Sequence, residues 1–201
     1  MSNNLRANDV RVALPLFQEE CGGSTPTLAL HLHFEPIHLR TALAMNKEWH
    51  SRLPDLPFNT VNMKHGRAFG AIHGGIYYAI AIWSTPVARQ LDDGETVELR
   101  RMAIADDAPK NTASRMLGWM VRELKKTHYK KAVSYQDTGA HKGTIYKAAG
   151  WKAERTQPAG ASGWDKGGKR YGKRFGEGNE IPHRSAKVRW AISLQNVQVK
   201  S

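Results

Sequence analysis

The fold is decided by residues 98–137, which read ELRRMAIADDAPKNTASRMLGWMVRELKKTHYKKAVSYQD. The runs at 96–105 and 130–135 are rich in apolar and β-favouring residues, as strands are. Between them lies a polar turn, and after it the apolar residues from Ala113 to Leu124 recur at helical spacing. A strand, a turn, a helix and a second strand in this order predict a crossover between two parallel strands.

The segments before this unit predict the antiparallel part of a sheet. A first strand is expected at 29–34, and Pro36 has the residue type that favours the first turn of a helix. Two β-favouring runs at 67–72 and 76–83 are joined by the residues HGG. Their spacing predicts a β-hairpin.

The segments after the unit complete the sheet. A short helix is expected at 141–150, where Gly150 ends it, and strands are expected at 151–155 and 188–194. We therefore predict an α/β protein with a mixed, mostly antiparallel central sheet and one parallel crossover. This is the pattern of the acyl-CoA-dependent N-acetyltransferase (GNAT-like) fold.

The charge points to a polyanionic partner. The 201 residues include 30 lysines and arginines against 18 acids, which gives a formal net charge of +12. Such cations displace counterions from phosphates, so the charge favours a nucleic acid. The alternative is a basic protein whose positive charge binds an acidic cofactor or only keeps the protein in solution.

The region 160–189 is rich in glycine, lysine and arginine with aromatic residues between them. This mixture suits a nucleic-acid backbone and an extruded base, although a basic loop without a partner has the same composition. We predict an N-terminal arm at 1–28 and one domain at 29–201 that contains this basic insertion. Double-stranded DNA is the predicted partner. The cations predicted to contact it are Lys166, Lys169, Arg170, Lys173, Arg174, Arg184, Lys187 and Arg189.

Several classes of protein are disfavoured. No window approaches the roughly 18 consecutive apolar residues of a membrane span, so no membrane partner is expected. The N-terminal residues lack a basic region followed by an apolar core, which predicts a cytoplasmic location. Cys21 is the single cysteine, so neither an internal disulfide nor a cysteine metal cluster is possible.

The turn at 106–115, DDAPKNTASR, is the candidate cofactor site. Unpaired backbone N–H groups at a helix N-terminus suit a phosphate, and Lys110 and Arg115 add positive charge. Lys110, Asn111 and Ser114 are therefore predicted to bind a cofactor, although an ordinary capped loop explains the same residues. The turn lacks the glycines that are usual in acetyltransferases, and the first glycine after it is Gly118.

Residues 134–151, SYQDTGAHKGTIYKAAGW, gather groups that can move protons. Asp137 stands where a strand ends, which suits a base or a metal ligand, but it can equally cap the following helix. Tyr146 can face either the core or a cleft. His50 precedes a proline-rich segment and by itself is a surface histidine, although a metal site built from separate His and carboxylate residues remains possible.

The chain resembles the Mom family of phage DNA-modification proteins. The resemblance rests on four segments in order: Leu99–Arg101, Pro109–Ser114, Ser134–Asp137 and Ala140–Ala148. The shorter segments TPVAR, WHSRLP and PHRSAKVRWAI add weaker matches. Two positions depart from the family pattern, because Ser51 follows His50 in place of a tyrosine and Ala140 replaces a glycine.

The resemblance implies an activity and a site. The family converts adenine in DNA to N6-carbamoylmethyl (acetamido) adenine, which protects phage DNA from restriction enzymes. It implies that Arg101 and Ser114 lie near acetyl-CoA or a related activated donor, with His50, Asp137 and Tyr146 around the reacting centre. Iron is associated with the family, and His50 and Asp137 are the candidate ligands.

Two other functions stay open at this point. One is a conventional acetyl-CoA-dependent N-acetyltransferase acting on a protein or a small amine. The other is a non-catalytic DNA-binding module on an acetyltransferase fold. The absence of a glycine-rich turn speaks against the first, and the ionisable groups at 134–146 speak against the second. The oligomeric state is left open, a dimer included.

Overall fold

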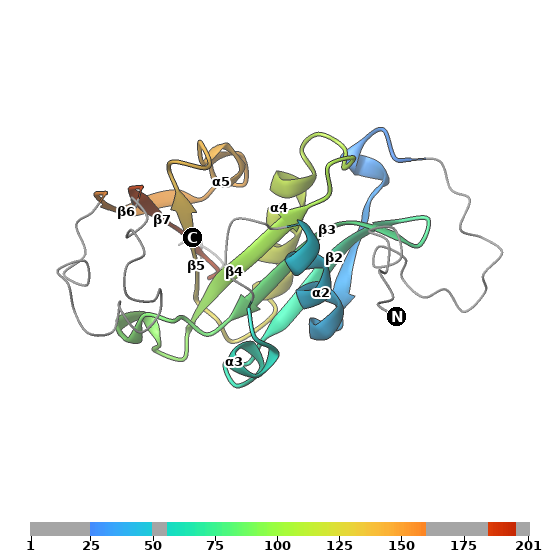
Figure 1. Ribbon diagram of the computed structural model, residues 1–201. Helices are drawn as coiled ribbons and strands as arrows, with labels where there is room; N and C mark the ends of the chain where they lie inside the picture. Colours follow the sequence, from blue (N-terminus) through green and yellow to red (C-terminus); the bar gives the residue numbers. More distant parts are fainter. Residues whose placement is uncertain (1–24, 50–55, 160–184, 196–201) are drawn as a thin grey trace, which may run out of the picture.

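The computed structural model describes residues 25–49, 56–159 and 185–195 (Figure 1). The strands are β1 (His33–Ile37), β2 (Arg67–His73), β3 (Ile76–Ser84), β4 (Thr96–Ile104), β5 (Lys131–Asp137), β6 (Lys152–Gln157) and β7 (Lys187–Ser193). The α-helices are α2 (Leu39–Trp49), α3 (Phe58–Asn62), α4 (Thr112–Leu124) and α5 (Thr144–Ala148). Short 3₁₀ turns lie at Ala29–His31 and Arg89–Leu91.

The strands form one seven-stranded sheet in the order β1-β2-β3-β4-β5-β7-β6. Among the described strands, β4 and β5 are the one parallel pair, and the other neighbouring pairs are antiparallel. Helix α4 connects the two parallel strands, as the sequence predicts. The predicted fold class, a mixed and mostly antiparallel sheet with one parallel crossover, is confirmed.

Helices cover the two faces of the sheet separately. Helix α4 packs on one face, where the fully buried Trp83 donates its indole N–H to the sulfur of Met120 at 3.0 Å. Helices α2 and α3 pack on the other face, over apolar residues of β2, β3 and β4. Side chains alternate between the faces of a strand, so the position of a residue along its strand decides which helix layer it meets.

The parallel strands separate after four residue pairs. The pairing of β4 with β5 runs from Thr96 with Lys131 to Leu99 with Ser134. A β-bulge lies at the same level of β4, because Ile82 of β3 pairs with Arg101 while Trp83 pairs with Leu99. Beyond this level β4 continues along β3 and β5 continues along β7. We call the opening between β4 and β5 the fork.

Two expectations for the N-terminal half are corrected. Pro36 does not begin a helix, because it lies in β1 and pairs with Phe69, and α2 begins at Leu39. Proline is tolerated there since β1 is an edge strand and needs no inward N–H at that position. The short helix α3 was not predicted. The predicted hairpin is present, with Gly74 and Gly75 at positive φ between β2 and β3.

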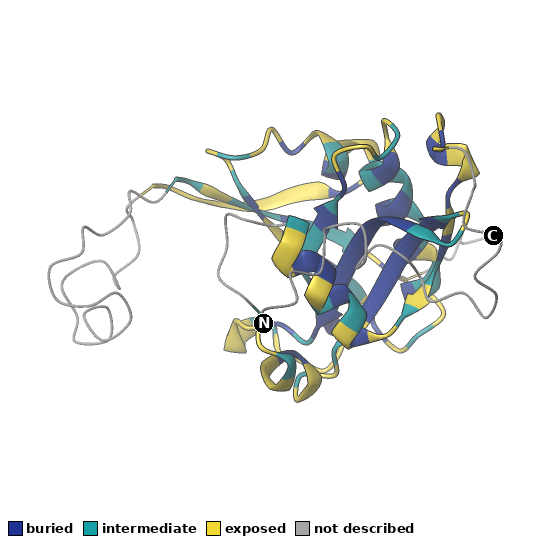
Figure 2. Cartoon of the chain, turned by 45° about the vertical axis from the view of Figure 1, so that its right-hand side comes forward, coloured by how far each residue is buried: buried dark blue, intermediate teal, exposed yellow. Residues whose placement is uncertain are grey.

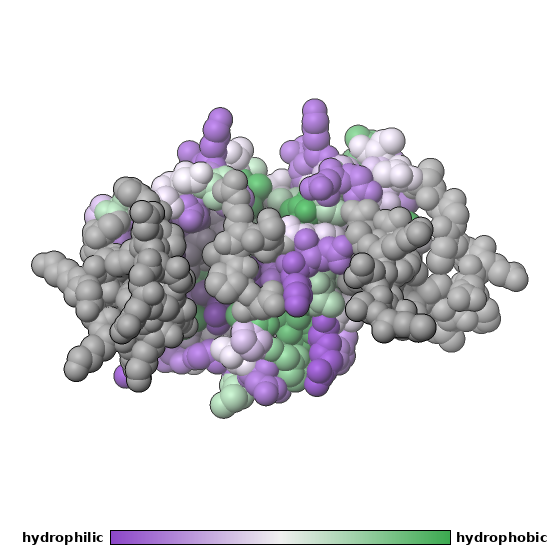
Figure 3. All heavy atoms as spheres, viewed as in Figure 1, coloured by the Kyte–Doolittle hydropathy of each residue, from purple (hydrophilic) through white to green (hydrophobic). Residues whose placement is uncertain are grey.

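One strand pair is mostly exposed, in contrast to the buried centre of the sheet. Figure 2 shows buried strands in the centre and a strand pair coloured mainly as exposed that extends from them. That strand pair includes β6, in which every residue is exposed. From the side of Figure 1, most described surface residues are hydrophilic, with smaller apolar areas between them (Figure 3). None of the helices in the described residues has the length and apolar character that a membrane crossing requires.

Candidate functional site

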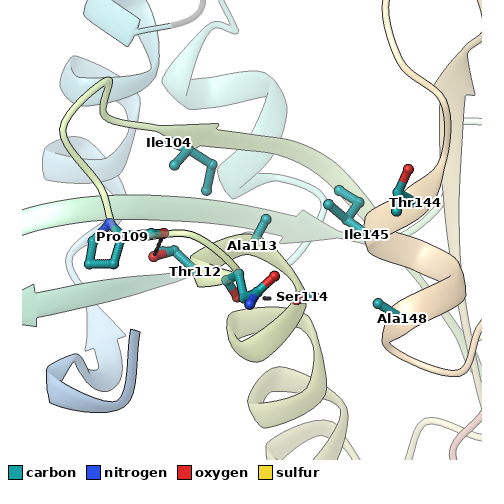
Figure 4. Close-up of a pocket in the computed structure, with 9 residues that line it drawn as sticks. Ile104, Pro109, Thr112, Ala113, Ser114, Thr144, Ile145 and Ala148 are labelled. Carbon is teal, nitrogen blue, oxygen red and sulfur yellow. Dashed lines mark hydrogen bonds between the residues drawn. The ribbon is translucent and has the colours of Figure 1, made fainter. Parts of the chain in front are cut away.

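A pocket lies between the N-terminus of α4 and helix α5, next to the fork (Figure 4). Its volume is about 210 Å³. One wall comes from the end of β4, the turn after it and the first residues of α4, and the other comes from α5. The lining residues are Ile104, Pro109, Asn111, Thr112, Ala113, Ser114, Thr144, Ile145 and Ala148.

The turn before α4 contains no glycine, and another residue adopts the left-handed backbone conformation there. Asn111 adopts the left-handed conformation with φ 68°, which asparagine tolerates better than most residues. Asn111 occupies the N-cap position of α4, but its side chain makes no capping hydrogen bond. The hydroxyls of Thr112 and Ser114 donate backward, to the carbonyl of Pro109 at 2.6 Å and the carbonyl of Asn111 at 3.1 Å. The first turn of α4 therefore presents N–H groups that no side chain caps.

Two cations flank this helix end, while Asp106 and Asp107 lie earlier in the same turn. Lys110 is exposed on the turn. Arg115 places its guanidinium 5.7 Å from the ring centre of Phe34, and its Nη1 is buried without a hydrogen-bond partner. A helix N-terminus with uncapped N–H groups and adjacent cations fits a phosphate-bearing ligand. The predicted residues Asn111 and Ser114 both line the pocket, with Lys110 beside them.

Tyr146 is buried at the base of the fork. Its hydroxyl lies 2.9 Å from the hydroxyl of Ser134, the last residue of β5 that pairs with β4. The ring stacks on Trp190 at 5.4 Å and meets Trp151 edge-on at 5.7 Å, and 8% of the residue is exposed. Burial raises the pKa of Tyr146 above its ordinary 10.0. The phenol therefore stays protonated at neutral pH and can donate a hydrogen bond or a proton.

Gly143 holds α5 against β5, and no larger residue fits there. Its φ is 72°, and an added Cβ would lie 2.5 Å from Oε1 of Gln136 and 2.8 Å from the ring of Trp190. Gln136 is itself fixed, because Trp190 donates its indole N–H to Oε1 at 2.7 Å. Gly143 is therefore required both by its backbone conformation and by close packing.

We expect Gly143→Ala to destabilise the protein more than Gly150→Ala. Gly150 has a similar φ of 79° but open space around it, so its substitution measures the backbone strain alone, about 1–2 kcal/mol. The contacts at Gly143 should add roughly another 1–3 kcal/mol. Urea unfolding of both variants measures the difference. Equal losses would show that the neighbours of Gly143 move aside without cost.

Asp137 lies at the end of β5 in a turn. Its Oδ1 accepts hydrogen bonds from the backbone N–H of Gly139 at 2.9 Å and from the hydroxyl of Ser185. The hydrogen bond from Ser185 is the largest influence and lowers the pKa of Asp137 below its ordinary 3.8. The carboxylate is therefore charged at neutral pH. This environment suits a residue that orients a positive or donating group better than one that removes a proton.

The structure separates residues that the sequence groups together. Asp137 and Ser134 are three positions apart on β5, so they face opposite sides of the sheet, and Tyr146 lies on the side of Ser134. Arg101 pairs with Ile82, whose side chain belongs to the α2–α3 core. The side chain of Arg101 is therefore on the face opposite the pocket of Asn111 and Ser114.

A buried charged cluster surrounds Arg101. Glu98 is buried, accepts the backbone N–H of Val87 at 3.0 Å and lies 3.4 Å from Nε of Arg100. Burial raises the pKa of Glu98 above its ordinary 4.5. Arg101 donates from Nη1 to the carbonyl of Arg100 at 2.8 Å, while its buried Nε has no partner. Sequence reasoning missed Glu98, although a glutamate that interrupts an apolar strand is a detectable signal.

The remaining predicted residues divide into two groups. Lys187 and Arg189 lie in β7, where Lys187 is exposed and Arg189 donates to Glu154 at 2.8 Å. The others lie outside the described residues. These are His50, Lys166, Lys169, Arg170, Lys173, Arg174 and Arg184.

The described residues do not fit an iron site. Within 25–49, 56–159 and 185–195, no three His, Cys, Asp or Glu side chains come close enough to hold a metal ion. Both hydrogen bonds that Asp137 accepts come from protein groups at the end of β5. Ligation by His50 and Asp137 stays a prediction from the resemblance.

A larger cavity of about 460 Å³ lies at the opposite end of α4, next to Arg67 and Lys126. It contains none of the predicted site residues. Lys126 is paired with Glu123 at 2.7 Å, and the guanidinium of Arg67 lies over the ring of Tyr129. Because these groups already have partners and the fork is at the other end of the helix, the smaller pocket is the better candidate site.

The α5 wall of the pocket was missed by sequence reasoning. Thr144, Ile145 and Ala148 line it from one side of the short helix. Their spacing of one and four positions along the chain predicts that they share one side of a helix. A helix of five residues is too short for the sequence to show which of its sides faces the fork.

Most of the sequence matches one family. Residues 31–174 match the sequence model of the Mom protein family. The chain is a member of the Mom protein family. The match spans the fork, the pocket of α4 and α5, and both Asp137 and Tyr146. No curated protein is detectably similar to the chain.

Solved structures agree on the fold. The chain is similar to the ribosomal-protein-S18-alanine N-acetyltransferase from Escherichia coli, with TM-score 0.57, 11% identity, and coverage of 85% of this chain and 98% of that one. It is similar to an N-acetyltransferase from Staphylococcus aureus Mu50, with TM-score 0.59, 13% identity and coverage of 82% and 99%. An acetyltransferase from Bacillus subtilis in complex with CoA gives TM-score 0.54, 14% identity and coverage of 82% and 99%. At these identities the likeness establishes the N-acetyltransferase fold of this Mom family member.

Proposed function

We propose that the protein modifies adenine in DNA, converting it to N6-carbamoylmethyl adenine, with an activated donor related to acetyl-CoA that carries the carbamoylmethyl group. The observation that carries the proposal is the fork: the hydroxyl of Tyr146 lies at its base, and α5, which carries Tyr146, forms one wall of the pocket at the N-terminus of α4. Membership of the Mom family supports DNA as the substrate. The net charge of +12 supports a polyanionic partner.

The pocket residues fit a CoA-type donor. The uncapped first turn of α4 suits the pyrophosphate, with Lys110 and Arg115 supplying positive charge. Ile104, Ile145 and Ala148 offer an apolar wall for the chain that leads toward the fork. When bound, the donor supplies a carbamoylmethyl group whose methylene carbon forms the new bond to N6 as the leaving group departs with the bonding electrons, whereas a plain acetyl thioester would give N6-acetyl adenine. The Bacillus subtilis acetyltransferase, which has the same fold, was solved with CoA.

The acceptor amine requires help from the protein. The lone pair of the adenine N6 amine is delocalised into the ring, so the amine is a weak nucleophile. The charged carboxylate of Asp137 can accept a hydrogen bond from the amine and orient it. The hydroxyl of Tyr146 can donate to the carbonyl oxygen or the leaving atom of the donor.

Nucleoside mass spectrometry tests the proposal directly. Plasmid DNA from cells that express the protein is digested and compared with DNA from cells that carry the empty vector. We expect a modified deoxyadenosine only in the first sample. Its repeated absence with soluble, folded protein would remove the proposed function.

A conventional N-acetyltransferase is the second candidate. It is favoured by the three solved acetyltransferases that share this fold. This activity predicts acetyl transfer from acetyl-CoA to an amine of a protein or small molecule, with unmodified DNA. The same cells can be analysed for acetylated proteins, so one experiment separates the two candidates.

We expect Ser114→Glu to weaken donor binding strongly without weakening the fold. A carboxylate in the first turn of α4 interacts favourably with the helix dipole, so the melting temperature should not fall. The same charge repels a phosphate, and at about 4 Å such a repulsion costs several kcal/mol near a protein surface. Calorimetric titration with CoA should show at least a roughly tenfold weaker affinity.

Ser114→Ala is the matched control for this charge. It removes the hydroxyl, which donates to Asn111 within the turn, but leaves the N–H groups of the helix end in place. Its affinity for CoA should stay close to that of the unaltered protein. Unchanged CoA binding by Ser114→Glu would show that the phosphates do not bind at this helix end.

A further inference from the structure

The fork has two sides, and the donor pocket lies on the side of α4 and α5. On the other side, α2 and α3 cover β2, β3 and β4, but strands β5, β7 and β6 contribute no residue to that core. The pairing register of β5, β7 and β6 shows which of their side chains lie on this side of the sheet. Tyr135 pairs with Arg189, Asp137 pairs with Lys187, and Arg189 pairs in turn with Arg155. Paired residues of a sheet point to the same face.

This side of the three strands is positively charged, and we call it the basic face. It carries five cations against the two carboxylates of Glu154 and Asp137. Glu154 is paired with Lys131 and Arg189, while Arg155 and Lys187 are exposed. The strand pair that carries this charge extends from the body of the protein (Figure 2). The five cations are Lys131, Lys152, Arg155, Lys187 and Arg189.

An aromatic ring and a guanidinium flank the fork on the basic face. Tyr135 is the first residue of β5 beyond the last pair with β4, and 40% of it is exposed, whereas Ser134 and Gln136 on either side are buried. Arg101 is the first residue of β4 beyond the bulge, and its buried Nε has no hydrogen-bond partner. Tyr135 thus presents an exposed ring and Arg101 an Nε without a hydrogen-bond partner on the same side of the fork, and a base and a phosphate can complete these two groups.

We propose that the basic face is the DNA-binding surface of the enzyme and that the target base, extruded from the duplex, stacks on Tyr135. This inference rests on the proposed function, because an enzyme that acts on a base must take it out of the helical stack. The cations of β5, β6 and β7 contact the phosphates, and Arg101 contacts the extruded nucleotide at the fork. The donor and the base thus approach the fork from opposite faces of the sheet.

The ring of Tyr135 is tested with two DNA probes, a duplex with one unpaired, bulged adenine and the same duplex fully paired. Tyr135→Ala should bind the bulged duplex at least about fivefold more weakly, the lower end of measured stacking contributions. Tyr135→Phe keeps the aromatic face and should retain the affinity. On the paired duplex the two variants should differ little. An unchanged affinity of Tyr135→Ala for the bulged duplex would overturn the stacking role.

The cations are tested by salt dependence. The double variant Arg155→Ala with Lys187→Ala should bind every duplex more weakly, and the slope of log affinity against log salt should fall by about 0.9 for each lost phosphate contact. The matched control is Arg122→Ala with Lys125→Ala, which removes two exposed cations at the C-terminal end of α4, on the other side of the sheet. The control should leave the slope unchanged. Equal changes in the two double variants would show that only net charge matters.

These titrations contain no donor, so they separate this inference from the proposed function. If the variants behave as expected but no modified adenine is ever found, the basic face stands and the proposed activity fails. If modified adenine forms while both face variants bind and modify DNA normally, the activity stands and this inference fails. A duplex RNA of the same sequence that binds as tightly and responds equally to Tyr135→Ala would assign the face to RNA and overturn the inference.

Discussion

Tyr146→Phe should fold but modify adenine at least about 100-fold more slowly, the lower range for loss of a positioned proton donor. The substitution keeps the ring, which packs between Trp190 and Trp151, and removes only the hydroxyl at the base of the fork. The stability cost should be about 0.5–1.5 kcal/mol, as for a single lost hydrogen bond. A melting curve and nucleoside mass spectrometry on one preparation measure both effects.

Ser134→Ala distinguishes catalysis from packing. It removes the same hydrogen bond as Tyr146→Phe but leaves the phenol at the fork. If the phenol only satisfies Ser134, the two variants should lose activity alike. If the phenol donates to the reacting group, Ser134→Ala should keep most of its activity. Because burial raises the pKa of Tyr146, ionisation of this phenol should not limit activity at any pH below its ordinary 10.0.

Short-range patterns predicted most of the elements. The crossover unit, the hairpin at Gly74 and Gly75 and the C-terminal strands follow from local periodicity and turn residues. The order of the strands does not, because β7 inserts between β5 and β6 after a long stretch of chain. Local patterns carry no information on such pairings. Pro36 was misplaced for a related reason, since only the pairing shows that β1 is an edge strand.

The candidate site was predicted as a set of residues but not as a geometry. Sequence placed Ser114 and Asn111 at a helix N-terminus, and both line the pocket. It grouped Asp137 with Tyr146 because they are close along the chain, yet they lie on opposite faces of the sheet. The face of the sheet on which a strand residue lies depends on its pairing register with partners that are far away in sequence. A bulge such as that at Arg100 also reverses the alternation of side chains between the two faces. The exposed position of Tyr135 beside the fork could not be predicted because it depends on this register.

Asp137→Asn should fold with near-normal stability, bind DNA and give little or no modified adenine. Asparagine keeps the oxygen that accepts hydrogen bonds from Gly139 and Ser185, and it caps turns about as well as aspartate. What it loses is the charge. If that charge orients the amine of the base or accepts its proton, the rate should fall by a factor of roughly 10² to 10⁴.

The pH dependence of stability gives an independent check on the substitution. The folded state lowers the pKa of Asp137, so the carboxylate stabilises the protein above its ordinary pKa of 3.8, and this contribution is lost as pH falls through the lower folded value. Asp137→Asn lacks this contribution at every pH. The small stability difference between the two proteins at neutral pH should therefore disappear in strong acid.

Ser185→Ala is the control that separates the charge of Asp137 from the turn it closes. It removes the hydrogen bond that lowers the pKa of Asp137 most but leaves the carboxylate, whose pKa should rise toward its ordinary value. At neutral pH the carboxylate remains ionised, so Ser185→Ala should keep most of the activity that Asp137→Asn loses. If both variants stay active, Asp137 only closes the turn at the end of β5. If both lose activity equally, both the charge and the hydrogen bond from Ser185 that closes the turn are needed.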